Sequence, residues 1–116
     1  VSLLRDCYIS WPEHRVKRWA LSFHKRAIAL GNIPPVDEAT FLRWFDLMGL
    51  QRHIKVLGIF ARLNYRDNKP AYLNDLPQVL SYVMTVGERH PETRALVTWL
   101  ERMDIPERIG MINIAA

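Results

Sequence analysis

The residues most suggestive of chemistry are four cations that recur at helical spacing in the second half of the chain. The set comprises Arg52, Lys55, Arg62 and Arg66. Steps of three, seven and four residues separate them, which places all four on one stripe of an α-helix, with Ile59 filling the gap. Residues 56–63 are otherwise apolar on almost every side, and this pattern predicts a helix inside the fold. A cationic stripe on such a helix must face water, a carboxylate or an anionic ligand.

Two explanations of this stripe stay open from the sequence. Carboxylates such as Asp6 or Asp67 could neutralise it within the chain, and residue types alone favour this structural explanation. An anion site would use the same cations differently, because Arg and Lys pair with carboxylate or phosphate groups of a ligand. Asp6 is itself notable, since its neighbours in the chain are mostly apolar. An acid in such a setting is either paired or placed to accept hydrogen bonds from ligand hydroxyls.

The signatures of a complete catalytic or metal site are not found. A kinase-like catalytic loop has Asp two residues after His, and no histidine in this chain has that neighbour. The five glycines are isolated, so there is no phosphate-cradling loop. His14 and His24 lie ten residues apart and Cys7 has no neighbouring thiol, a spacing that does not suit zinc. A nucleophile pair of Cys7 with a distant histidine stays open, although a cysteine in an apolar helix is usually an inert core thiol. We therefore expect no catalytic residue, no metal and no cofactor site in this chain.

Bulk composition describes an ordinary globular chain. Its 116 residues suffice for one domain with a real core, and 49% of them are apolar. Sixteen Lys and Arg against twelve Asp and Glu give a net charge of +4, a mild excess that permits an anionic ligand but makes nucleic acid an unlikely partner. The apolar runs are too short to span a bilayer. A single cysteine and the lack of a signal-peptide pattern favour a cytoplasmic setting with no membrane partner.

Helical periodicity dominates the whole chain and predicts an all-α fold of about six antiparallel helices. The first helix is expected over residues 2–9, ending before Pro12. The second runs from residue 10 to Gly31, and the third over residues 37–49, with Gly49 as its stop. The central fourth helix covers residues 51–66 and threads the middle of the domain. A fifth starts near Pro77, and a sixth starts at Pro91.

The second predicted helix is rich in cations. They are Arg15, Lys17, Arg18, Lys25 and Arg26. They could bind nucleic acid, but a solvated outer face is the favoured explanation. Five aromatic residues lie at core spacing: Trp19, Phe23, Trp44, Phe45 and Trp99. They are better explained by packing than by base stacking, which needs exposed rings interleaved with charge.

Two segments together resemble a known family. They are SLLRDCYI followed by WP (residues 2–12), and KVLGIFARL followed by RD and KPAY (residues 55–72). The chain resembles the carboxy-terminal part of aminoglycoside-phosphotransferase-like sugar kinases, in the branch that phosphorylates amino sugars during bacterial cell-wall recycling. This resemblance covers essentially the whole chain.

The resemblance implies that residues 1–116 form one helical domain, the C-terminal subdomain of a protein-kinase-like large lobe. The nucleotide lobe, the catalytic Asp loop and the metal-binding Asp of the family all precede the part that this chain matches. By that resemblance the chain alone is not catalytic, while the parent enzyme uses ATP and Mg²⁺ to phosphorylate an amino sugar. The residues carried over as candidates for substrate binding are Arg5, Asp6, Arg52, His53, Lys55 and Arg62.

The chain begins with Val1 and shows no early capping residue, so we interpret it as a fragment of a longer kinase, with the N-terminal lobe as its natural partner. An exposed face at Leu3, Leu4 and Tyr8 would then promote self-association. The alternative is a stand-alone helical interaction module that binds an acidic protein or nucleic acid.

Overall fold

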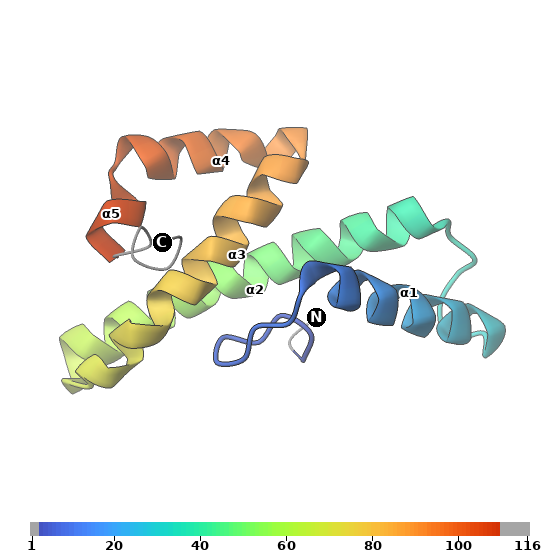
Figure 1. The fold of residues 1–116 in the computed structure, drawn as a ribbon, viewed down its shortest axis with the longest axis horizontal. Coiled ribbons are helices and arrows are strands. Elements are labelled where there is room, and N and C mark those ends of the chain that lie inside the picture. The colour runs from blue at the N-terminus through green and yellow to red at the C-terminus, as the bar shows by residue number, and fades with distance from the viewer. Residues whose placement is uncertain (1–2, 110–116) are drawn as a thin grey trace. The chain divides into compact units, whose positions relative to one another are not determined.

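The chain folds into helices only, in the part that the structure describes. The computed structural model describes residues 3–109, with residues 1–2 and 110–116 left out. In chain order the elements are α1 (Glu13–Ala29), α2 (Glu38–Asp67), a short 3₁₀ helix η1 (Pro70–Asp75), α3 (Leu76–Arg89), α4 (Pro91–Arg102) and α5 (Ile105–Ile109) (Figure 1). The described residues contain no strand, which confirms the all-α fold.

The chain divides into two compact units. One reaches as far as Gly49 and the other begins at Leu50, so the division falls within α2. The first unit holds α1 and the start of α2, and the second holds the rest of α2 with η1, α3, α4 and α5.

The N-terminal segment differs from its prediction. Residues 3–12 form turns and bends instead of the expected helix over residues 2–9, of which Ser2 lies outside the described residues. The Asp6 carboxylate explains the difference, because its Oδ2 accepts hydrogen bonds from the backbone N–H groups of Tyr8 and Ile9, each at 2.9 Å. A short acidic side chain that binds the following backbone in this way competes with helix formation.

Helix α1 starts and stops close to where the sequence predicts. The Pro12 carbonyl accepts the first backbone hydrogen bonds of the helix, from Arg15 and Val16. Gly31 has φ of 73°, and its N–H and that of Asn32 donate to the last carbonyls of the helix. This is a Schellman-type ending, in which glycine adopts the left-handed conformation without a Cβ penalty.

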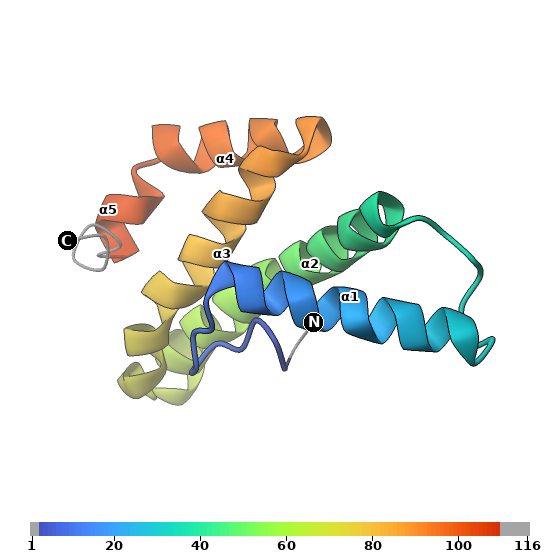
Figure 2. The ribbon, with the colours of Figure 1, turned by 45° about the vertical axis from the view of Figure 1, so that its right-hand side comes forward.

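Helix α1 packs on the start of α2 through aromatic contacts. The buried His24 ring stacks on Phe41 with 4.5 Å between ring centroids, and its Nε2 lies 2.9 Å from the Val36 carbonyl oxygen. Figure 2 shows the extended loop that leads from α1 into α2. Asp37 caps α2, because its Oδ1 accepts the backbone N–H of Thr40 at 2.8 Å. Hydrogen bonds from Thr40 lower the pKa of Asp37 below its ordinary value, and the side-chain bond has a larger effect than the backbone bond.

Helix α2 is one continuous helix where the sequence suggested two. Residues 37–49 and 51–66 were expected to be separate helices with a stop at Gly49, but α2 runs through both. Glycine inside a helix costs only about 1 kcal/mol relative to alanine. Leu50, His53 and Phe60 are buried at helical spacing on the far side of Gly49, so the buried face continues past the glycine. The helix ends where Asn68 adopts φ of 53°, as asparagine tolerates.

The second unit has a compact apolar core. Partly buried Leu57, Leu96 and Ile105 pack against this core. The buried members come from α2, α3 and α4, and they are Leu50, Leu80, Val83, Met84, Val86, Val97 and Leu100. Helices α3 and α4 meet at a close corner after His90, as the His90–Pro91 break predicts (Figure 1). A Cβ added at Gly87 would lie 2.6 Å from Val97 Cγ2, so glycine at this position lets the two helices approach closely.

Candidate functional site

The cationic stripe of α2 is exposed. Arg52, Lys55, Arg62 and Arg66 all face solvent in the second unit, and Ile59 between them is 41% exposed. At 3.6 residues per turn, the four cations lie within an arc of about 80° on the helix. They therefore form one positively charged strip, interrupted at Ile59, which we name the α2 strip.

The prediction that residues 56–63 lie inside the fold is wrong for one face of the helix. Phe60 is buried, yet Gly58 and Ile59 beside it are exposed. Only one face of this part of α2 enters the core of its unit, through residues such as Leu50. Glycine and isoleucine are compatible with a solvated face, so an apolar run of mixed side-chain size does not by itself require burial.

The α2 strip is largely uncompensated by acids. Arg66 Nε lies 3.5 Å from Asp67 Oδ1, so the structural explanation holds for this residue. Among residues 3–109 the other three cations of the strip form no salt bridge. Three cations on one exposed face that form no salt bridge within the described residues can bind an anion of a ligand or partner.

A residue that the sequence analysis passed over accompanies the strip. Tyr65 is 89% exposed and lies one turn after Arg62 on α2. A tyrosine ring with this exposure offers an apolar face and a hydroxyl for contact with a sugar ring. The signal was available in the sequence as a tyrosine three residues after a stripe cation.

His53 does not belong to the strip. Its side chain is buried, and its ring stacks on Tyr82 of α3 with 4.7 Å between centroids and 15° between planes. The contact joins two helices of the same unit. The geometry therefore gives His53 a packing role within the second unit.

Arg5 lies at the centre of a buried ion-pair network in the first unit. It is 4% exposed, and its Nη1 donates to Asp46 Oδ1 at 2.8 Å. Its Nη2 donates to Glu13 Oε1 at 2.5 Å, and its guanidinium carbon lies 4.7 Å from the centroid of the Phe45 ring. The guanidinium thus joins the N-terminal segment to α1 and α2, and this arrangement is that of a structural clamp.

The sequence-predicted candidates fall into two groups that are described separately. Arg5 and Asp6 belong to the first unit, where one is a clamp and the other holds a turn. Arg52, Lys55 and Arg62 belong to the second unit and share one exposed face. The structure therefore brings together three of the six candidates as an accessible cationic surface.

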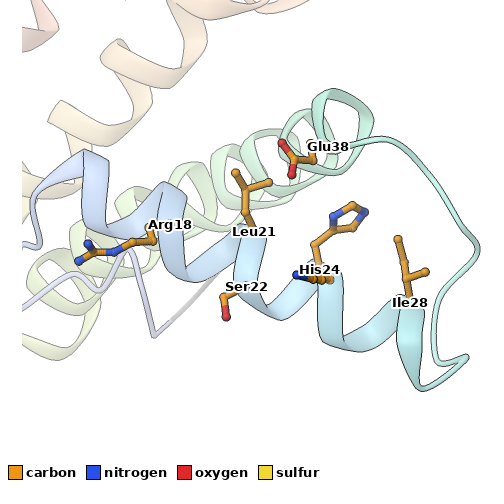
Figure 3. Close-up of a pocket in the computed structure, with 7 residues that line it drawn as sticks. Arg18, Leu21, Ser22, His24, Ile28 and Glu38 are labelled. Carbon is orange, nitrogen blue, oxygen red and sulfur yellow. The ribbon is translucent and has the colours of Figure 1, made fainter.

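The first unit also contains an open hollow between α1 and the start of α2. It has a volume of about 480 Å³, and its lining comprises Arg18, Leu21, Ser22, His24, Lys25, Ile28 and Glu38. Figure 3 shows Leu21, His24 and Ile28 directed toward the side of α1 where Glu38 lies, whereas Arg18 points along the helix away from them. Arg18 therefore lies at the margin of the hollow and does not point into it.

Residues 3–109 contain no group of three or more His, Cys, Asp or Glu side chains that could hold a metal ion. None of the helices in this part of the chain combines the length and the apolar character needed to cross a bilayer.

Sequence comparison connects the chain with one class of enzyme. It is 44% identical over 94 residues to the N-acetylmuramate/N-acetylglucosamine kinase of Pseudomonas putida, a match that covers 81% of this chain. The chain is homologous to sugar kinases. The kinases of the same name from Neisseria meningitidis and Pseudomonas aeruginosa are each 46% identical, over 102 and 94 residues, covering 86% and 81% of the chain.

The match to these sugar kinases concerns only part of each relative. The chain spans 28% of the Pseudomonas enzymes and 30% of the Neisseria enzyme. These matches confirm the resemblance seen in the sequence. No family model matches the chain, and no solved structure matches it.

Proposed function

We propose that this chain is the C-terminal, acceptor-sugar side of an ATP-dependent amino-sugar kinase in the cytoplasm, and that it does not transfer phosphate on its own. The similarity to three kinases of one name, at 44–46% identity, carries this proposal. The matched part is less than a third of each of these relatives. ATP and Mg²⁺ would be held by the N-terminal lobe of such a kinase, which is the natural partner of this chain.

The α2 strip supplies the sugar-recognition chemistry in this proposal. N-acetylmuramate differs from N-acetylglucosamine by a lactyl ether that carries a carboxylate. Arg52, Lys55 and Arg62 are exposed cations without a salt bridge in the described part of the chain, and guanidinium and ammonium groups bind carboxylates by charge-assisted hydrogen bonds. Tyr65 adds an exposed ring that can cover a sugar face.

Roles for Arg5 and Asp6 in this proposal are indirect. Arg5 is engaged with Asp46 and Glu13, so it would support the shape of the first unit and not contact the sugar. The Asp6 carboxylate holds the backbone of the following two residues through Oδ2. His53 would act as a positioning residue for α2 through its stack on Tyr82.

The test is a comparison of the two sugars by amide chemical shifts in the purified chain. We expect N-acetylmuramate to perturb residues of the α2 strip more than N-acetylglucosamine does, because only the former carries the carboxylate. A variant with Arg52→Gln, Lys55→Gln and Arg62→Gln should lose this difference. Equal perturbation by both sugars, or perturbation confined to the first unit, would contradict the assignment.

A matched control and an activity assay complete this test. The variant Lys69→Gln with Arg102→Gln removes exposed cations outside the strip and should keep the preference for N-acetylmuramate. The wild-type chain mixed with ATP, Mg²⁺ and either sugar should produce no sugar phosphate. Turnover by the purified chain would show that the proposal has placed the chemistry in the wrong part of the enzyme.

A further inference from the structure

The outward face of α1 carries a second cationic surface, separate from the α2 strip. It consists of Arg15, Arg18, Lys25 and Arg26 around the small residue Ser22, and all five are exposed. On a helix with 3.6 residues per turn they fall within an arc of about 100° and extend over about 16 Å. The buried residues of α1, such as Val16 and Ala20, lie on the opposite side. We name this surface the α1 ridge.

Within residues 3–109, no acid neutralises the charges of the α1 ridge through a salt bridge. The acid in the first turn of α1, Glu13, pairs with Arg5. Among residues 3–109, none of the four ridge cations forms a salt bridge. Four cations in one short arc repel one another, and an acidic partner would relieve that repulsion.

Apolar side chains flank the α1 ridge on both sides. Phe23 and Leu30 are 64% and 72% exposed and lie along one edge. Leu21 and Ile28 lie along the other edge, where they line the hollow of about 480 Å³ beside Glu38 (Figure 3). A cationic centre with apolar borders is complementary to a partner that has an acidic centre and apolar borders.

We propose that the α1 ridge binds an acidic amphipathic helix of a partner protein. Interfaces with nucleic acid are more polar and more positively charged than those between proteins, so apolar borders that include the aliphatic Leu30 favour a protein partner. Protein interfaces combine apolar contact with arginine, which is the commonest cation of this ridge. Ser22 in the centre allows another helix to approach closely, and the arc of the ridge matches the width of one helix face. This inference does not depend on the proposed sugar site, because it uses other residues in the other unit.

Fluorescence anisotropy with a labelled synthetic peptide tests the inference. The probe is a helical peptide with a stripe of glutamates bordered by leucines, and its scrambled counterpart has the same composition. We expect the ordered peptide to bind the full chain, and the variant Arg18→Glu with Lys25→Glu to reduce its affinity by about tenfold, since two attractive pairs become repulsive. The milder variant Arg18→Gln with Lys25→Gln should give an intermediate loss.

A charge-matched control separates the ridge from overall net charge. The variant Lys69→Glu with Arg102→Glu changes the net charge equally but alters exposed residues of the second unit. It should leave peptide affinity unchanged, and circular dichroism should show native helix content in every variant used.

Several outcomes would overturn the inference. Equal binding of the scrambled peptide, or equal loss with the control variant, would show attraction to net charge alone. Peptide affinity that survives the Arg18→Glu and Lys25→Glu changes would exclude the ridge as the site. Ridge-dependent binding of a single-stranded oligonucleotide or of phosphatidylglycerol vesicles, without binding of the ordered peptide, would assign the surface to another class of partner.

Discussion

The first unit should be less stable when Arg5 is replaced by methionine, because the Arg5 guanidinium neutralises a buried acid. Asp46 has a side chain only 10% exposed and accepts a hydrogen bond from Arg5 at 2.8 Å. Loss of one partner from a buried ion pair costs about 3–5 kcal/mol. Glu13 is 47% exposed at its side chain, so its pair with Arg5 adds only about 0–1 kcal/mol. These contributions are not additive, and we expect a total loss of about 3–5 kcal/mol of unfolding free energy.

Urea unfolding followed by tryptophan fluorescence measures this loss. Trp11 and Trp19 of the first unit pack edge to face with 5.4 Å between ring centroids, so their emission reports on this unit. The double variant Arg5→Met with Asp46→Leu removes both charges and should recover a large part of the lost stability, since apolar replacement of a buried ion pair is often nearly neutral. This recovery would distinguish an uncompensated charge from a simple loss of packing.

One result would refute the reasoning about Arg5. The free energy of unfolding of Arg5→Met could lie within about 0.5 kcal/mol of the wild-type value, as it does for ordinary surface changes. In that case the Arg5 side chain does not hold the first unit together. Arg5 would then return to the group of residues available for sugar binding. If the clamp is real, Arg5→Met should alter stability while the N-acetylmuramate shifts at the α2 strip persist in the folded protein.

Three further changes test other parts of the structure. Gly87→Ala should destabilise the second unit by about 1–3 kcal/mol in urea unfolding, because the new Cβ would lie 2.6 Å from Val97 Cγ2, and adding Val97→Ala should reduce the penalty of Gly87→Ala. The Asp37 pKa is lowered by its hydrogen bonds to Thr40, so its stabilising effect should be full above the unfolded pKa of 3.8 and disappear as pH falls through the lower folded pKa. The difference in urea midpoint between wild type and Asp37→Ala should therefore shrink toward zero on acidification, and a constant difference down to the lowest pH would contradict this. Val83→Ala should cost about 1.5–3 kcal/mol by thermal or urea unfolding, since Val83 is 0% exposed, and a near-neutral result would mean that the core of the second unit is wrongly assigned.

Local sequence signals predicted the structure correctly where neighbouring residues determine the backbone conformation. Gly31 ends α1 because a left-handed residue is needed there, and Pro91 begins α4 because its missing N–H costs nothing in a first turn. The buried residues of α3, Leu76, Val79, Leu80, Val83 and Met84 among them, recur at helical spacing. The same kind of reasoning failed at Gly49, where the cost of an interior glycine is small beside the burial of residues on both sides of it.

The candidate site shows the same contrast. The spacing of the four cations was enough to place them on one face of α2, and the sequence likeness was enough to connect the chain with sugar kinases. Spacing could not tell that this face is exposed, that Arg5 is enclosed by Asp46 and Glu13, or that His53 is stacked on Tyr82.

The sequence by itself therefore determined the helical class of this protein, most of its helix ends and the alignment of its cations, because backbone conformation and side-chain periodicity depend on near neighbours in the chain. Only the tertiary structure decided which of those charges are neutralised and which remain available. Arg5 and Asp46 are 41 residues apart in the chain, and a pairing over such a separation depends on how helices pack. Packing brings distant carboxylates to some cations and leaves other cations exposed. Local sequence patterns do not predict which cations are paired in this way.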